Sequence, residues 1–110
     1  MKVANISLHI SQLGKANQLR QPHIRNEVIQ FLYQNVQDIE PKNLIVSLEV
    51  LFHNLNRNEK SDIDLMRFEK IIDDSVSQKV DLNTLSRVSR FYQYCSPEFQ
   101  SSFAERCIHF

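Results

Sequence analysis

Hydrophobic residues recur along this chain at helical spacing, with side chains at positions i, i+4 and i+7 on one helix face. The second such triplet follows the first by 38 residues, and the third follows the second by 41. Ser89 interrupts the third triplet, and neighbouring Val88 can take over its buried position. The triplets are Ile6, Ile10 and Leu13, then Leu44, Leu48 and Leu51, then Leu85, Ser89 and Tyr92. Each triplet predicts the first helix of a helix pair.

The second helix of each pair is indicated by a recurring start signal, a polar N-cap residue followed by proline or aspartate. These starts are Gln21-Pro22, Ser61-Asp62 and Ser96-Pro97. Apolar residues follow each cap at two fixed distances, and the caps and apolar positions recur together at offsets of 40 and 35 residues. The apolar residues are Val28 and Leu32, Phe68 and Ile72, and Phe103 and Cys107. Ser61 with Asp64 fits a capping box, and Glu40-Pro41 and Asp81-Leu82 mark two starts of first helices.

The pattern predicts an all-α protein with one helical-repeat domain over residues 1–110. The helix pairs cover about 3–36, 41–76 and 82–109. Three antiparallel hairpins with a period near forty residues are typical of a short α-solenoid. An irregular six-helix bundle is the alternative, and the aligned caps favour the solenoid. The six predicted helices are 3–17, 22–36, 41–57, 62–76, 82–95 and 97–109.

Composition agrees with this class. The chain has one glycine in 110 residues, too few for the turns of an all-β fold or for a glycine-rich phosphate loop. Its 42% hydrophobic and 24% charged residues are ordinary for a globular protein and argue against disorder. No stretch approaches the roughly 20 apolar residues of a membrane helix, so we expect no membrane insertion.

Thirteen basic and thirteen acidic residues cancel, so bulk charge favours neither nucleic acid nor a membrane surface. The charges are unevenly distributed, since residues 1–35 carry a net +3 and residues 36–75 a net −4. The first 26 residues contain four basic residues and no acid, as mitochondrial transit peptides do. Because the same segment fits the helical repeat, we expect it to be structural.

The sequence offers little for catalysis. Cys95 and Cys107 form no Cys-x-x-Cys pair, which predicts buried free thiols in a reducing intracellular compartment. Four dispersed histidines form no metal-binding pair, and acidic pairs such as Asp62 with Asp64 fit a first helical turn. We therefore expect neither an enzyme nor a cofactor, a metal or a small-molecule substrate.

Two segments resemble the degenerate helical-hairpin repeats of organellar RNA-binding proteins, the octotricopeptide and heptatricopeptide repeats found beside FAST and RAP domains. Such repeats open with an acidic or polar residue, a short gap and a Leu-x-x-x-Leu-x-x-Leu helix. Residues 40–51 and 81–92 resemble this opening, with Ser89 and Tyr92 in place of the last two leucines in the second segment. The resemblance implies a non-catalytic subunit of a mitochondrial ribonucleoprotein assembly, such as a ribosome. Three repeats fit either a small subunit or a piece of a longer repeat protein.

RNA contacts are expected on the polar faces of the first helices, which line one surface in a solenoid. Arginine binds phosphate or stacks on a base, and an aromatic ring supplies a stacking platform. The spacing of Arg87, Arg90 and Tyr94 predicts a common face on the third first helix. The candidate RNA-binding residues are Lys15, His53, Arg57, Arg87, Arg90 and Tyr94.

Protein interaction is the competing function class, because three small hairpins have little room to bury all their aromatic residues. The C-terminal helix ends without a polar tail, which suggests that it docks on another protein subunit. The candidate interface residues are Phe91, Ile108 and Phe110. The alternative function is therefore a protein-protein adaptor or scaffold subunit with no RNA contact.

Overall fold

A computed structural model describes residues 1–76 and 81–108, and it confirms the all-α class. The described residues form seven α-helices and three short 3-10 segments, with no strand. The α-helices are α1 (Ile6–Lys15), α2 (Pro22–Gln34), α3 (Pro41–His53), α4 (Arg57–Ser61), α5 (Met66–Ser75), α6 (Leu82–Val88) and α7 (Pro97–Ile108). The 3-10 segments are η1 (Val3–Asn5), η2 (Gln18–Arg20) and η3 (Tyr92–Tyr94).

Four predicted helix starts are confirmed. Three helices begin at a proline, Pro22, Pro41 or Pro97, where the missing N–H and the fixed φ of proline suit the first turn. The fourth start is capped by Asp81, whose carboxylate accepts a hydrogen bond of 2.7 Å from the backbone N–H of Thr84. Local start signals therefore place these helices correctly.

The predicted helices 41–57 and 62–76 are wrong at their junction, because a short extra helix lies between them. Asn56 begins α4 through a capping box: it accepts from the Glu59 backbone N–H, and the Glu59 carboxylate accepts from the Asn56 N–H, each at 2.8 Å. Ser61 is thus the last residue of α4 and not a cap. The predicted box of Ser61 with Asp64 is absent, and the Asp64 N–H donates to the Tyr33 hydroxyl at 2.8 Å.

The predicted helix 82–95 is also wrong, since α6 ends at Val88. The Ser89 hydroxyl donates to the Ser86 carbonyl at 2.6 Å, a local bond that competes with helix continuation. The chain then turns, which brings Phe91 into the interior. The first predicted helix, 3–17, is a 3-10 segment followed by α1, and the turn after α1 holds Asn17 in the left-handed region at φ 59°.

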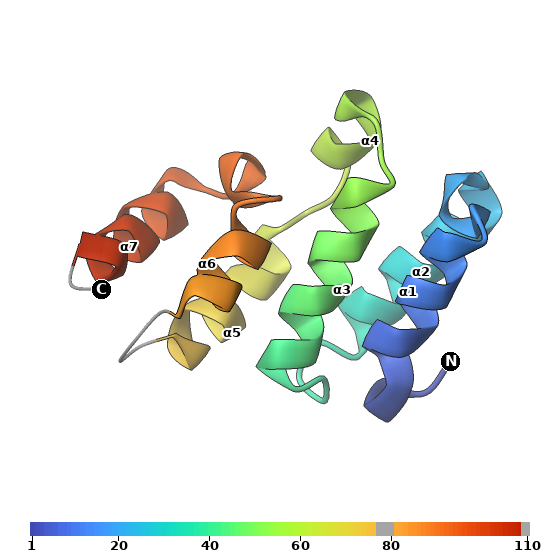
Figure 1. Ribbon diagram of the computed structural model, residues 1–110, viewed down its shortest axis with the longest axis horizontal. Helices are drawn as coiled ribbons and strands as arrows, with labels where there is room; N and C mark the ends of the chain where they lie inside the picture. Colours follow the sequence, from blue (N-terminus) through green and yellow to red (C-terminus); the bar gives the residue numbers. More distant parts are fainter. Residues whose placement is uncertain (77–80, 109–110) are drawn as a thin grey trace.

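The first helices of the predicted pairs pack in a row, α1 against α3 and α3 against α6 (Figure 1). The second helices α2 and α5 lie behind this row, α5 packs against both α3 and α7, and α7 lies at the end of the row beyond α6 (Figure 1). Tyr33 of α2 stacks on Phe68 of α5 with ring centroids 5.5 Å apart. This order agrees with stacked hairpins, while the classification as an α-solenoid stays a prediction.

The core is centred on α3, in which five apolar side chains and Ser47 are buried. The Ser47 hydroxyl donates to the Asn43 carbonyl at 2.7 Å, so its burial leaves no polar group unpaired. Gly14 permits α1 to approach α3 closely, because a Cβ there would lie 3.3 Å from Val50 and 3.0 Å from Asn54. The single glycine therefore serves helix packing.

Polar ties join α5 to the start and middle of α7. The Glu69 carboxylate accepts from the Ser96 N–H at 2.7 Å and from its hydroxyl at 2.6 Å. One turn later, the Asp73 carboxylate accepts from Ser102 at 3.1 Å and pairs with Arg106 at 3.3 Å. These bonds fix how α7 lies against α5.

Replacement of Phe91 by alanine tests this core. Phe91 is fully buried, and its ring lies 5.8 Å from that of Phe52. We expect Phe91→Ala to lower the free energy of unfolding by about 3 to 5 kcal/mol, because it leaves a cavity between α3 and the turn after α6. Leu82→Ala is the matched control, since Leu82 is 68% exposed and should change the value by at most about 0.5 kcal/mol. Urea unfolding of both variants measures the difference, and equal losses would contradict this account of the core.

Candidate binding surfaces

A polar groove lies where the C-terminal end of α1, the 3-10 segment η2 and the C-terminal end of α3 meet. Its volume is about 440 Å³, and Lys15, Arg20 and His53 line it together with Asn17 and Asn54. A second hollow of about 350 Å³ shares Arg20, His53 and Asn54 and continues toward the start of α4. We call the residues Lys15, Arg20 and His53 with these two amide side chains the basic groove.

The acid that lines the second hollow is paired with a cation outside the basic groove. Glu59, at the far end of the second hollow, forms an ion pair of 2.7 Å with Arg25 and also caps α4. Lys15, Arg20 and His53 lie in the last turns of α1, η2 and α3. The helix dipole favours cations at the C-terminal end of a helix, so the Lys15 charge also stabilises α1.

Two of the predicted RNA-binding residues are engaged within the protein. Arg87 of α6 forms an ion pair of 2.7 Å with Glu49 of α3. The Tyr94 ring packs at 5.7 Å from the ring of Phe52, and the Lys60 ammonium lies 6.0 Å from its centroid. Because α6 ends at Val88, the predicted common helix face of Arg87, Arg90 and Tyr94 is wrong.

The four other candidates are exposed, but only two of them meet. Lys15 and His53 line one groove, as expected of neighbouring first helices. Arg57 begins α4, and Arg90 lies in the turn after α6; neither lines the groove. Of the six predicted RNA-binding residues, only Lys15 and His53 therefore form a local site.

The predicted protein interface needs one correction. Phe91 is fully buried against Phe52 and cannot contact a partner. Phe110 and the side chain of Ile108 lie outside the described residues. Phe52 is buried as well, so the three hairpins hide more aromatic surface than the sequence suggests.

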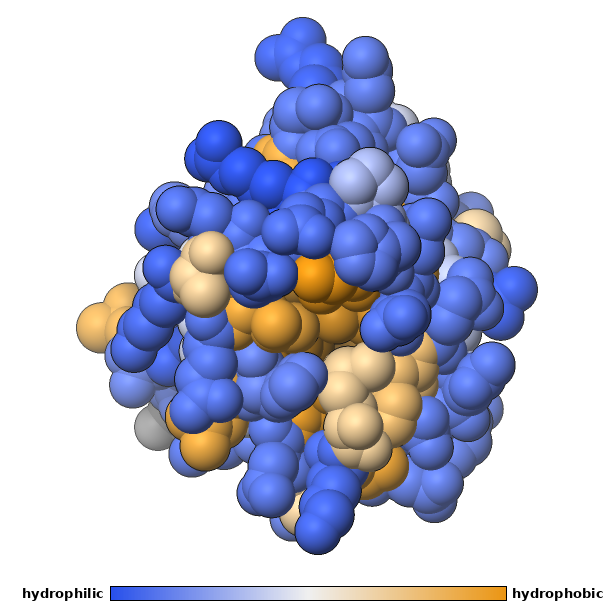
Figure 2. All heavy atoms as spheres, turned by 90° about the vertical axis from the view of Figure 1, so that its right-hand side faces the viewer, coloured by the Kyte–Doolittle hydropathy of each residue, from blue (hydrophilic) through white to orange (hydrophobic). Residues whose placement is uncertain are grey.

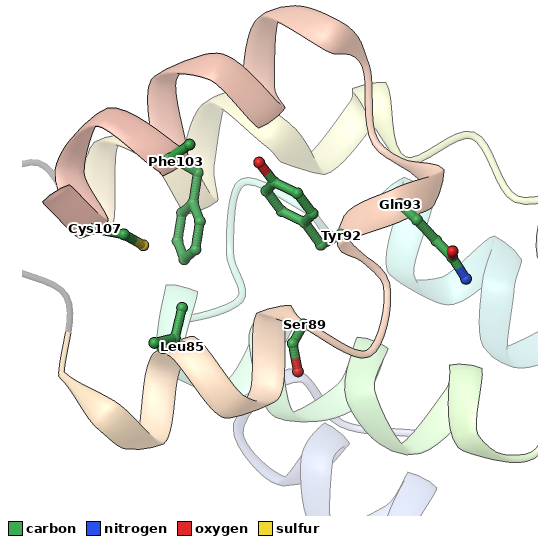
Figure 3. Close-up of a pocket in the computed structure, with 7 residues that line it drawn as sticks. Leu85, Ser89, Tyr92, Gln93, Phe103 and Cys107 are labelled. Carbon is green, nitrogen blue, oxygen red and sulfur yellow. The ribbon is translucent and has the colours of Figure 1, made fainter.

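An apolar hollow of about 430 Å³ opens between α6, η3 and α7 (Figure 3). The rings of Tyr92 and Phe103 lie at its centre, 5.9 Å apart, with Leu85 below them and Cys107 at one end. Leu85 and Tyr92 are half-buried, while Ser89 at the rim is exposed. The hollow is lined by Leu85, Ser89, Tyr92, Gln93, Phe103, Ala104 and Cys107. We call this set the apolar hollow.

The two free cysteines have different surroundings. Burial, together with the negative charge of Glu69, raises the pKa of the Cys95 thiol to about 12. That thiol donates to the Phe91 carbonyl at 3.6 Å. Cys107 is half-buried, and its sulfur points into the apolar hollow (Figure 3). The prediction of free thiols is confirmed, although only Cys95 is fully buried.

Sequence reasoning missed Arg20 and the apolar hollow. Arg20 reaches the basic groove because the turn at Asn17 reverses the chain after α1, and Gly-Lys-Ala-Asn is a turn signal that marks this reversal. The hollow depends on the early end of α6, for which Ser86 and Ser89 are the local signal. Without three-dimensional packing, neither signal identifies a binding surface.

Other kinds of site find no support in the described residues. None of the helices within 1–76 and 81–108 has the length and apolar character of a membrane span. The same residues contain no group of three His, Cys, Asp or Glu side chains able to hold a metal ion. No family model, curated protein or solved structure matches the chain.

Thiol labelling separates the two cysteines. At pH 8 a water-soluble aromatic disulfide reagent should modify Cys107 readily and leave Cys95 unmodified, because a thiol with a pKa of about 12 stays protonated and is buried. Absorbance of the released thiolate gives the stoichiometry. Cys107→Ser should abolish the rapid phase, whereas Cys95→Ser should keep it. Rapid modification of two thiols in the folded protein would contradict the packing of Cys95.

Proposed function

We propose that this protein is a non-catalytic helical subunit of a ribonucleoprotein assembly that contacts RNA through the basic groove and neighbouring proteins through a separate surface. The observation that carries the proposal is the meeting of Lys15, Arg20 and His53 in one groove, beside the Asn17 and Asn54 amides. Cations bind RNA phosphates, and amides bind base edges or sugar hydroxyls.

The shape and size of the groove support a single-stranded segment as the RNA partner. A groove of about 440 Å³ at the end of two helices has room for about one or two nucleotides and cannot enclose a duplex. The net charge of the whole chain is zero, so only local charge can attract phosphate. We therefore expect modest affinity with a strong dependence on salt.

The resemblance to organellar repeat proteins supports this function class, and on the same ground we propose a mitochondrial localisation. That localisation rests on residues 40–51 and 81–92 alone. Both segments lie in the row of first helices, where α3 and α6 pack side by side. In repeat proteins, such a row forms an extended binding surface.

A protein-protein adaptor without RNA contact is the second candidate. Two observations favour it: Arg87 and Tyr94 are held by contacts inside the protein, and an apolar hollow is open on the surface. In this case the basic residues of the groove only stabilise the C-terminal ends of the helices that carry them. RNA binding by the isolated protein distinguishes the two candidates.

Removal of two groove cations tests the RNA contact. We expect Lys15→Gln with Arg20→Gln to weaken binding of a fluorescent single-stranded RNA about tenfold at 50 mM salt. The slope of log K against log salt should fall by about 1.4, since each phosphate contact to a single strand contributes about 0.7. Fluorescence anisotropy between 50 and 200 mM salt measures both quantities.

Lys42→Gln with Lys70→Gln is the matched control, because both lysines are exposed and lie outside the groove. This control has the same net charge as the groove variant and should keep most of the affinity and slope. Equal losses in the two double variants would show nonspecific attraction. Absence of binding by the natural protein at 50 mM salt would contradict the RNA proposal and leave the adaptor.

A further inference from the structure

Three residues of the apolar hollow occupy the same repeat positions as residues that are buried in the second pair. By the offsets of 41 and 35, Leu85, Tyr92 and Phe103 correspond to Leu44, Leu51 and Phe68. All three of those counterparts are at most 1% exposed. In the first pair, the offsets of 38 and 40 give Ile6, Leu13 and Val28 as the equivalent residues; Ile6 and Val28 are at most 1% exposed, and Leu13 is half-buried. In the third pair Phe103 is only 2% exposed, whereas Leu85 and Tyr92 are half-buried. The groove between the two helices is thus filled in the second pair and partly open in the third.

In each of the first two pairs, the following pair covers the groove. Val50 and Asn54 of α3 lie against Gly14 in the first pair. In the second pair, Phe91 packs on Phe52, and Ser96 binds Glu69. The occupant is therefore a helix and its flanking turn. The apolar hollow between α6 and α7 has the shape and lining that accept a further helix.

Charge specifies this occupant more closely. In the second pair, Glu49 binds Arg87 of the helix that covers the groove, at 2.7 Å. The residue of the third pair that corresponds to Glu49, by the offset of 41, is Arg90, which is exposed and has no ion pair within the described residues. Glu49 lies on α3, whereas Arg90 lies in the turn after α6, next in sequence to the rim residue Ser89. A helix that covers the hollow should therefore carry an acidic residue that can reach Arg90.

We propose that the apolar hollow is a docking groove for one amphipathic α-helix of a partner protein, which buries an apolar face there and pairs an acidic residue with Arg90. The docking groove rests on the protein contact of the proposed function and specifies that contact. It does not require that the protein bind RNA. The mode is the helix-in-groove recognition that other proteins use for apolar anchors spaced three and four residues apart. The rim residues Ser89 and Gln93 offer polar groups beside the anchors.

A second copy of this chain fits the groove less well. Its free end is the α1–α2 side, where apolar atoms gather at the centre of a mostly hydrophilic face (Figure 2). The α1 residue that corresponds to Arg87 is Leu8, which is uncharged and 60% exposed. The helix equivalent to α6 is α1, which contains no acid to pair with Arg90; the single acid of the α1–α2 side is Glu27, in α2. The reversed charge therefore selects a different, acidic helix.

Two synthetic peptides test the proposal. Both copy residues 40–54, which contain the helix that covers the groove of the first pair, and they differ at the position that corresponds to Arg87. One carries Val46→Glu and the other Val46→Lys. We expect the Glu peptide to bind the natural protein about fivefold more tightly at low salt, and Arg90→Glu in the protein to reverse that preference. NMR amide shifts on titration should be largest around Leu85, Tyr92 and Ala104.

Ala104→Glu, which places a charge in the hollow from an exposed position, should weaken both peptides, whereas Ser101→Glu elsewhere on α7 should weaken neither. RNA affinity is measured on the same variants, so failure of docking and failure of RNA binding are separate results. The proposal is overturned if neither peptide binds, if Arg90→Glu does not reverse the preference, or if the shifts lie outside α6–α7. Concentration-dependent shifts at the hollow without peptide would show instead that a second copy fills it.

Discussion

The structure depends on the burial of α3, the central helix of the row. Its buried residues face α1 on one side and α5 and α6 on the other, so it is the only element among residues 1–76 and 81–108 that packs on three other α-helices extensively. Each fully buried Leu, Ile or Phe contributes about 1.5 to 3 kcal/mol. Gly14 lets α1 approach, and Phe52 receives Phe91 from the last pair. Both candidate binding surfaces are positioned by these contacts.

The two surfaces arise from the ends of helices that α3 holds. At its C-terminal end, the turn after α1 and the start of α4 leave the basic groove, whose cations offset the negative ends of the helices. On the far side of α6, the third pair has no further helix packed on it among the described residues, and the apolar hollow remains. One packing arrangement thus produces a polar site and an apolar site that lie apart. The proposed RNA contact and the proposed partner helix therefore use different surfaces.

Local chemistry made much of the fold predictable. Proline at Pro22, Pro41 and Pro97 and the cap at Asp81 start helices at the expected residues, and the triplets mark the buried faces of α1 and α3. Helix ends were predicted poorly, because Asn56 forms a competing capping box and the Ser89 hydroxyl bonds to the preceding turn. Each of these bonds involves only a few residues at a helix end, so the longer pattern of apolar positions does not reveal it.

The candidate site was predictable only in part. Lys15 and His53 lie together because neighbouring first helices do, which the repeat already implies. Three residues were misassigned because each contacts a residue of α3 that lies 38 to 42 positions earlier in the chain. Arg87 pairs with Glu49, and the rings of Phe91 and Tyr94 pack on Phe52. A sequence pattern locates the face of a helix but cannot tell which polar side chains find partners across the interior.

Native-state hydrogen exchange tests the central role of α3 most directly. If α3 holds the fold together, its amides exchange only when the whole protein unfolds, with a free energy of opening equal to the free energy of unfolding in urea experiments. The amides of α4 and η2 should exchange through local openings of lower free energy. If α3 amides exchanged at lower free energy than those of α1 or α7, the helix would not hold the fold together, and this account would be wrong.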